Sequence, residues 1–322
     1  MNKRLDNLLD TIGNTPLVHL RDLSKKYNCP VYGKLECFNP SMSMKDRIVK
    51  YIIEKAEKEG ILKPGMTIVD ATSGNTGLSI ALLALIKGYK CILTVKDSSA
   101  KAKIDQLQLF GARVILCPAK AKPDDPNSYY SVSKRIAANT PNCFFLDQNH
   151  NMDHFEAHYH GMGKEIWEQS EGQVSHFFAP ASTGGSISGI GAYLKEHNPN
   201  VKVICADAKG SVFKYYHENG IYNKELKKDT PLEGVGKDII TSVFKTEYID
   251  ECVTVDNENS IQNALDLLQT EGIFVGGSSG AGIDAFKQYM DKYPDEKITM
   301  AVINFPDYGL KYMDKLYHTD SK

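Results

Sequence analysis

Short apolar segments alternate with longer amphipathic segments along most of this chain, and this alternation limits its possible folds more than any other feature. We expect strands over 30–36, 66–71, 90–95, 113–117, 176–180, 201–207 and 297–304. We expect helices over 44–59, 77–87, 102–110, 131–138, 156–168, 188–197 and 260–270, an exposed loop over 118–127 and an irregular stretch over 210–230. Such a succession is typical of parallel, doubly wound sheets. The sequence therefore predicts an α/β fold with two lobes, in which ligands bind at the carboxyl ends of the strands.

Length and charge narrow the function classes. A chain of 322 residues is long enough for two lobes. With a formal net charge of −2, it has no basic excess for binding nucleic acid or an anionic membrane. The longest apolar run, Leu78 to Ile86, is too short to span a bilayer, and the basic start lacks the apolar stretch of a signal peptide. The seven cysteines are dispersed without a Cys-x-x-Cys pair, so we expect reduced thiols and a cytoplasmic protein.

A lysine stands at the start of a predicted helix, in the segment Ser43-Met44-Lys45-Asp46-Arg47. A nearby helix start and partial burial lower the pKa of an amine, which must be deprotonated to attack a carbonyl carbon. A lone lysine at the start of a helix would normally be a solvated surface residue. The loops that follow it favour the catalytic interpretation.

Two loops rich in glycine and hydroxyl side chains each follow an apolar strand and begin a helix. They are Thr72-Ser73-Gly74-Asn75-Thr76-Gly77 and Ser182-Thr183-Gly184-Gly185-Ser186. Main-chain N–H groups at such a helix start bind anions, although the same residues also serve as ordinary helix caps. The second loop has neither the dinucleotide nor the nucleoside-triphosphate pattern. One amine and two anion sites predict a Schiff-base enzyme that holds a phosphorylated cofactor and a carboxylate substrate.

His154 and His158 have the spacing that places two imidazoles on one helix face. A zinc protease would need a glutamate directly after the first histidine and a third ligand, and Phe155 stands in that position. We therefore expect no metal, and we interpret both residues as surface or cleft histidines.

The assembled motifs resemble those of the fold-type II pyridoxal-phosphate (PLP) enzymes, in the cysteine synthase and cystathionine β-synthase family. The motifs run in order along almost the whole chain: Ile12-Gly13-Asn14-Thr15-Pro16-Leu17, Asn39-Pro40, Ser43 to Arg47, Thr72 to Gly77, Asp147-Gln148, Ser182 to Ser186, Glu233-Gly234-Val235-Gly236, Gly277-Ser278-Ser279-Gly280 and Pro306-Asp307. The resemblance implies a tryptophan synthase β-like architecture of twisted parallel sheets with helices on both faces. A larger cofactor-binding domain would comprise 1–41 and 152–322, and a smaller mobile domain would comprise 42–151. It implies neither the haem-binding extension nor the C-terminal regulatory pair of larger cystathionine β-synthases.

The resemblance also implies a role for each site residue. Lys45 would form the internal aldimine with PLP and move the Cα proton. Asn75 would bond the ring oxygen of the cofactor, and Ser278 would face its pyridine nitrogen. The cofactor phosphate would be held by Ser182, Thr183, Gly184, Gly185 and Ser186. The substrate would be bound by Thr72, Ser73, Gly74, Thr76 and Gln148 at its carboxylate, with Glu233 near its amino group or a nucleophilic water.

The implied reaction is β-replacement or β-elimination on L-serine, an O-activated serine or L-cysteine, by way of an aminoacrylate intermediate. Cysteine, cystathionine, lanthionine, or serine plus hydrogen sulfide would be the products. Ser41 and Met42 replace two common glycines and Asn149 replaces a common aromatic residue. Because these departures fall on the substrate side, the donor and the acceptor stay open. The alternatives are a serine or threonine dehydratase, a diaminopropionate-precursor synthase using O-phosphoserine, and a catalytically silent partner-binding homologue. Relatives imply a homodimer.

Overall fold

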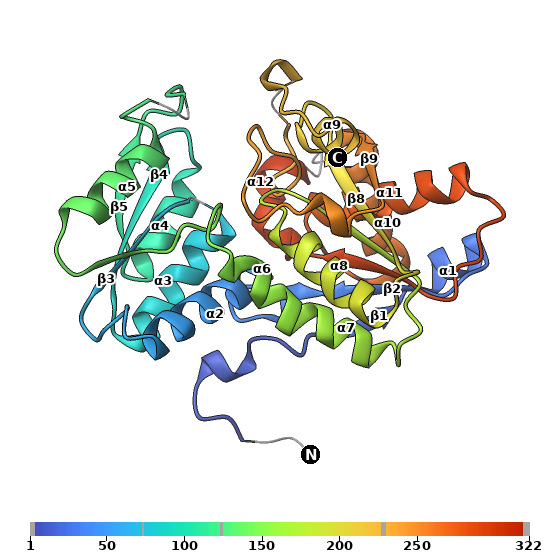
Figure 1. Cartoon of the computed structure of the whole chain (residues 1–322), viewed down its shortest axis with the longest axis horizontal. Coiled ribbons are helices and arrows are strands. Elements are labelled where there is room, and N and C mark those ends of the chain that lie inside the picture. Colours follow the sequence, from blue (N-terminus) through green and yellow to red (C-terminus); the bar gives the residue numbers. More distant parts are fainter. Residues whose placement is uncertain (1–3, 73, 123–124, 227–229, 318–322) are drawn as a thin grey trace, which may run out of the picture. The chain divides into compact units, whose positions relative to one another are not determined.

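The computed structural model describes residues 4–72, 74–122, 125–226 and 230–317 (Figure 1). The chain divides into two compact units. Unit 1 comprises Met1–Ile12 and Lys45–His154, and unit 2 comprises Gly13–Met44 and Phe155–Lys322. The expected division, with a cofactor-binding domain of 1–41 and 152–322 and a mobile domain of 42–151, stays a prediction.

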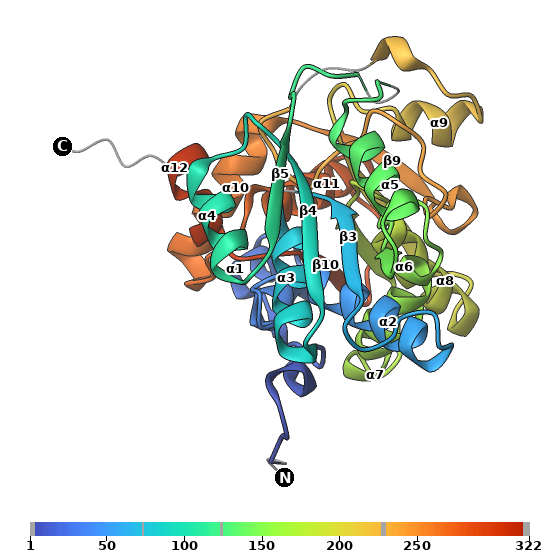
Figure 2. The ribbon, with the colours of Figure 1, turned by 90° about the vertical axis from the view of Figure 1, so that its left-hand side faces the viewer.

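Unit 1 is built on a parallel sheet in the order β5-β4-β3-β6. Its strands are β3 (Thr67–Ala71), β4 (Lys90–Lys96), β5 (Arg113–Cys117) and β6 (Cys143–Phe145). Its helices include α2 (Lys45–Lys58), α3 (Asn75–Lys87), α4 (Lys101–Leu109) and α5 (Tyr129–Asn139), after a short 3-10 turn, η1 (Leu8–Thr11). Figure 2 shows α3 and α4 on one face of the sheet and α5 on the other. Because α3 packs between the sheet and α2, it is apolar nearly all round and buried from Thr76 to Ala84.

Unit 2 is built on a sheet in the order β1-β2-β10-β7-β8-β9, parallel except for the edge strand β1. The strands are β1 (Leu17–His19), β2 (Val31–Leu35), β7 (His176–Pro180), β8 (Lys202–Ala208), β9 (Glu251–Val255) and β10 (Ala301–Phe305). Side chains alternate between two buried faces: Phe178 belongs to the core with α11 (Gly277–Lys292), and Phe177 belongs to the core with α8 (Gly185–His197). Burial on both faces explains why these strands are continuous apolar runs.

The remaining elements of unit 2 connect or cover this sheet. They are α1 (Arg21–Tyr27), α7 (Lys164–Gln169), α9 (Phe213–Asn219), α10 (Asn257–Glu271), α12 (Met313–Leu316), and the short turns η2 (Glu36–Phe38), η4 (Lys224–Leu226), η5 (Thr246–Tyr248) and η6 (Gly309–Tyr312). The helix expected over 156–168 is in fact three consecutive segments: α6 (Asp153–Ala157), the π-helix η3 (His158–Gly163) and α7. The π-helix packs on α8 where an ideal Cβ on Gly189 would lie 2.4 Å from the Phe155 carbonyl oxygen.

The α/β class with parallel sheets and helices on both faces is confirmed. The expectation of an irregular stretch over 210–230 is wrong at α9, which ends at Gly220 in the left-handed conformation with φ 69°. Strands β1, β6 and β9 were not expected from the sequence. Within the described ranges, no helix has both the length and the apolar character to cross a membrane.

Candidate functional site

The first predicted anion loop lies in unit 1, between the end of β3 and the start of α3. Gly74 is the N-cap of α3 and supplies no side-chain cap, while its N–H donates to Thr72 Oγ1 at 3.3 Å. Asn75 and Thr76 are the first two residues of the helix. An ideal Cβ on Gly77 would lie 2.9 Å from the Thr72 carbonyl oxygen, so glycine lets the helix begin directly against the strand end. Ser73 lies outside the described residues.

Gln148 reaches this loop from a distant part of the sequence. Thr76 Oγ1 donates to Gln148 Oε1 at 2.6 Å, across a sequence separation of 72 residues. The structure thus brings together two of the residues predicted to bind the substrate carboxylate. Both are on unit 1, and the Gln148 amide nitrogen is a donor suited to a carboxylate.

Lys45 is the first residue of α2 and is half-buried. The next residue, Asp46, is fully buried and accepts a hydrogen bond from Ser79 Oγ at 2.6 Å. This bond ties the first turn of α2 to the first turns of α3. Sequence reasoning missed Ser79, because its partner lies 33 positions away on another helix.

The segment directly before Lys45 in the chain is fixed within unit 2. The Met44 N–H donates to the Pro306 carbonyl at 2.9 Å, and Lys311 Nζ donates to the Ser41 carbonyl at 2.7 Å. Met42 has a positive φ of 58°. Only glycine adopts this conformation at little steric cost, which explains physically why a glycine suits the position better than a methionine.

The second predicted anion loop, Ser182 to Ser186, lies in unit 2 between β7 and α8. Gly184 is the N-cap of α8, has φ 88° and supplies no side-chain cap. An ideal Cβ there would lie 2.6 Å from Phe244, so position 184 has no room for a side chain. Thr183 and Ser186 are buried hydroxyl residues, Gly185 is buried and Ser182 is half-buried. Helix N–H groups together with hydroxyls form a donor set that fits a phosphate monoester.

Two further predicted motifs meet this loop at the same edge of the unit 2 sheet. The Gly236 N–H donates to the Ala181 carbonyl at 2.6 Å, and an ideal Cβ on Gly234 would lie 3.7 Å from Ser278 Cβ. Ser278 is buried in the first turn of α11. The N–H of the α11 N-cap, Gly276, donates to the Asp307 carbonyl at 3.3 Å. The carboxyl ends of strands and the starts of helices therefore converge here, as in other ligand-binding α/β sheets.

Glu233 is partly exposed and forms an ion pair with Lys315 of α12, with Oε1 and Nζ 3.2 Å apart. An exposed pair of this kind contributes little to stability. Its predicted contact with the substrate stays a prediction.

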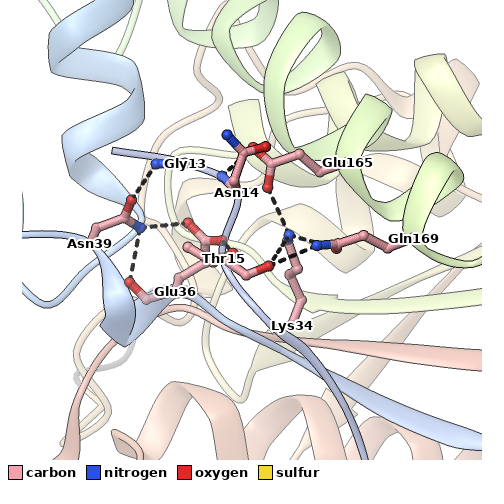
Figure 3. Close-up of polar contacts among 8 residues, drawn as sticks. All are labelled: Gly13, Asn14, Thr15, Lys34, Glu36, Asn39, Glu165 and Gln169. Atoms are coloured by element: carbon pink, nitrogen blue, oxygen red, sulfur yellow. Dashed lines mark hydrogen bonds and ion pairs between the residues drawn. The ribbon is translucent and has the colours of Figure 1, made fainter. Parts of the chain in front are cut away.

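A buried polar network holds the Gly13-Asn14-Thr15 segment in unit 2 (Figure 3). Lys34 Nζ is fully buried and donates to the Thr15 carbonyl, Glu165 Oε2 and Gln169 Oε1 at 2.7, 2.7 and 2.9 Å. The Asn14 N–H donates to Glu165 Oε1 at 2.8 Å. On the other side, Thr15, Glu36, Asn39 and Gly13 form a continuous chain of hydrogen bonds. The network joins β2 and α7 to the Gly13-Asn14-Thr15 segment. Through Glu36 and Asn39 it also includes the stretch of chain that precedes Lys45.

The interpretation of His154 and His158 as surface or cleft residues is wrong, because both side chains are fully buried. His154 Nδ1 lies 2.9 Å from the Gln148 main-chain oxygen, and His158 packs against α8 near Gly189. Across the described residues, no group of three His, Cys, Asp or Glu side chains is placed to hold a metal ion.

Comparison with known proteins identifies the family. The family described as pyridoxal-phosphate dependent enzyme matches residues 8–304. The chain belongs to this family. It is a PLP-dependent enzyme of the cysteine synthase and cystathionine β-synthase group. The donor set at the start of α8 fits the phosphate of PLP.

Curated relatives support this assignment. Cystathionine β-synthase from Apis mellifera is 39% identical over 319 residues, which cover 97% of this chain and 61% of the relative. The chain thus spans about three fifths of that longer protein. Cysteine synthase from Dictyostelium discoideum is 34% identical over 97% of this chain and 84% of the relative.

Two solved structures have the same fold. A structure titled O-ureido-L-serine synthase has a TM-score of 0.89 at 26% identity, covering 99% of this chain and 97% of that chain. The structure of a hydrogen sulfide-producing enzyme from Fusobacterium nucleatum has a TM-score of 0.85 at 29% identity. The match covers 97% of this chain and 99% of that chain.

Proposed function

We propose that the chain is a PLP-dependent lyase or transferase that performs β-replacement or β-elimination on L-serine, an O-activated serine or L-cysteine. Its products are sulfur amino acids, or serine plus hydrogen sulfide. The observation that carries the proposal is the Thr76–Gln148 pair at the start of α3, which suits the carboxylate of an amino acid. The names of the relatives and of the two similar structures support the serine-type substrate.

Bound PLP supplies an electron sink that stabilises negative charge at the substrate Cα. In the proposal, Lys45 Nζ would hold the cofactor before the substrate binds. Once the substrate amino group has replaced it on the cofactor, the freed amine would take the Cα proton. The residues from Ser182 to Ser186 would hold the cofactor phosphate, Asn75 would bond the ring oxygen, and Ser278 would serve as the hydroxyl partner of the ring nitrogen. A hydroxyl partner would leave the nitrogen largely unprotonated, which would weaken the electron sink and favour expulsion of a β-substituent.

The substrate side of the proposal lies on unit 1. Thr72, Ser73, Gly74, Thr76 and Gln148 bind the substrate carboxylate through N–H and hydroxyl donors and the helix start. This fixes the Cα–H bond relative to the base that removes the proton. Glu233 is proposed to face the substrate amino group or a nucleophilic water.

The test is to record the visible absorbance of the purified holoenzyme while L-serine, O-acetylserine, O-phosphoserine and L-cysteine are added separately. We expect the cofactor band to shift with at least one donor and to return when an acceptor thiol or sulfide is added. The Lys45→Ala variant should lose the band of the lysine-bound cofactor while its far-UV circular dichroism is unchanged. A holoenzyme that responds to none of the four donors contradicts the proposal.

Product analysis separates the alternatives on the same fold. Mass spectrometry should find a thioether amino acid, cysteine, or serine with hydrogen sulfide. Steady formation of a keto acid from serine or threonine would instead assign a dehydratase. Consumption of O-phosphoserine with an amine acceptor would assign a diaminopropionate-precursor synthase, and a stable partner complex without turnover would assign a silent homologue.

We also propose that the enzyme is a cytoplasmic homodimer acting on a small-molecule amino acid. The seven cysteines are free thiols, which fits a reducing compartment. Phe38 and Leu310 are 63% and 57% exposed on neighbouring segments of unit 2, linked by Lys311 to Ser41, and exposed apolar side chains suit a subunit contact. Light scattering should give twice the mass of the chain, and a monomer would contradict the dimer.

A further inference from the structure

We propose that His154 is a positioning residue, which holds the main chain of Gln148 so that its amide faces the substrate carboxylate. The inference rests on the proposed function of Gln148. His154 itself does not touch substrate or cofactor in this proposal, and acts only through Gln148.

The hydrogen bond between the two residues has a defined direction. His154 Nδ1 lies 2.9 Å from the Gln148 carbonyl oxygen, and a carbonyl can only accept. The proton therefore resides on Nδ1, which fixes the tautomer of the ring. The side chain is fully buried, so water does not compete for this contact.

Gln148 is held at two points by residues of unit 1. Thr76 Oγ1 fixes its side-chain oxygen at 2.6 Å, and His154 fixes its main-chain oxygen. A change of main-chain conformation at Gln148 would break the second bond, so the His154 contact limits the conformations open to the residue that carries the amide. The imidazole thus removes a rotation that would otherwise have to be frozen on substrate binding.

The residues around Gln148 are fixed separately from the residue itself. Asp147 has a left-handed φ of 52° and accepts a hydrogen bond from the Tyr130 hydroxyl at 3.1 Å. Asn151 Nδ2 donates to the Leu146 carbonyl at 3.1 Å. These contacts hold residues 146 and 147, whereas the His154 contact acts on residue 148.

His154 is itself held firmly. Its main-chain N–H donates to the Asn151 carbonyl at 3.0 Å, and the adjacent Asp153 forms an ion pair with Lys55 of α2. The helix that begins at Lys45 thus anchors the segment from which the imidazole projects. A residue needed only to fill space would be apolar, since burying an imidazole is unfavourable unless it is hydrogen-bonded.

Two substitutions separate positioning from packing. In His154→Asn the amide nitrogen branches from Cγ at the place of Nδ1 and keeps the donor. His154→Leu keeps the bulk and removes the donor. We expect His154→Leu to raise KM for the donor amino acid about fivefold to tenfold with kcat within about twofold, since one hydrogen bond is lost. His154→Asn should stay within about twofold of the wild type in both constants.

A binding readout accompanies the kinetics. The dissociation constant of the donor, obtained by titrating the cofactor absorbance, should rise by the same factor in His154→Leu and not in His154→Asn. The affinity for PLP should be unchanged in both. Equal donor affinity in the wild type and His154→Leu overturns the proposal, as does an equal loss in both variants.

A measurement on the wild-type protein covers the case in which His154→Leu fails to fold. The ¹⁵N shifts of labelled histidine should show His154 as the Nδ1–H tautomer, and an Nε2–H tautomer overturns the proposal. A wild-type holoenzyme that binds no donor amino acid contradicts the proposed function instead. The failure of one proposal is therefore distinguishable from the failure of the other.

Discussion

The shape of the loop before α8 depends on a single residue, Gly184. Its φ of 88° favours glycine, and a Cβ at this position would collide with Phe244. Thr183 and Ser186 supply hydroxyls, but the absence of a side chain at Gly184 allows the main chain to form the turn at all. A residue with a Cβ would be strained by its conformation and would also displace the phenyl ring.

We therefore predict that Gly184→Ala lowers the free energy of unfolding by about 3 kcal/mol, combining left-handed strain with overpacking. Gly220→Ala is the matched control, because Gly220 has φ 69° with no atom within 4 Å of its ideal Cβ. It should cost about 1 to 2 kcal/mol from strain alone. Urea unfolding measures both, and the PLP content of the purified proteins should fall only in Gly184→Ala. Equal effects in the two variants would show that the contact with Phe244 is unimportant.

The two glycine-rich turns between strand and helix were predictable from the local sequence, whereas the residues that meet them from distant positions leave no local pattern. Gly184 and the hydroxyls of the two loops stand at strand-to-helix turns, where their chemistry is apparent from a few neighbouring residues. The spacing of His154 from His158 indicates only that two imidazoles share one helix face, and it predicts no metal and no main-chain partner. The actual partner of His154 is a main-chain carbonyl, which no pattern of side-chain types records.

At the scale of elements, the regular βα units were predictable and the exceptions have physical causes. Strands β3 and β8 are apolar runs of ordinary length, whereas β6 has three residues and too little pattern to detect. The π-helix η3 depends on Gly189 of α8, and sequence periodicity contains no information on such a close approach. The end of α9 did have a readable signal, since Gly220 is a typical left-handed C-cap.

The Lys34 network is an element-scale feature that joins β2, α7 and the Gly13-Asn14-Thr15 segment. We predict that Lys34→Met lowers the free energy of unfolding by about 3 to 5 kcal/mol, because Glu165 loses its buried partner. The control is Lys164→Met. The Lys164 side chain is 54% exposed, and its Nζ lies 3.7 Å from Glu168 Oε1. Removing that exposed pair should cost at most about 1 kcal/mol. The measurement is the free energy of unfolding of both variants in urea. A similar small decrease in both would mean that the network does not stabilise unit 2.

At the scale of the whole molecule, Asp207 links stability to pH. It lies at the end of β8, is 1% exposed and accepts a hydrogen bond from the Lys214 N–H at 2.9 Å. Desolvation by burial raises the pKa of its carboxyl from 3.8 to about 6, against the weaker lowering effects of Ser211 and Lys214. Between these values the folded state binds more protons than the unfolded state. The contribution of Asp207 is therefore most favourable below pH 3.8 and is lost as pH rises through about 6.

We predict that Asp207→Asn becomes more stable relative to the wild type as pH rises, by about 2 kcal/mol between pH 4 and pH 7. The quantity to measure is the difference between the two proteins in urea unfolding at each pH. Other titrating groups do not affect this difference. Burial lowers the pKa of His176, which makes the folded state more stable as pH rises, but this contribution is the same in both proteins and cancels in their difference. The contribution from the raised pKa of Asp284 cancels in the same way. Any hydrogen bond that asparagine forms poorly shifts the whole curve by a constant. A difference that does not change with pH would therefore show that Asp207 is ionised alike in the folded and unfolded chains.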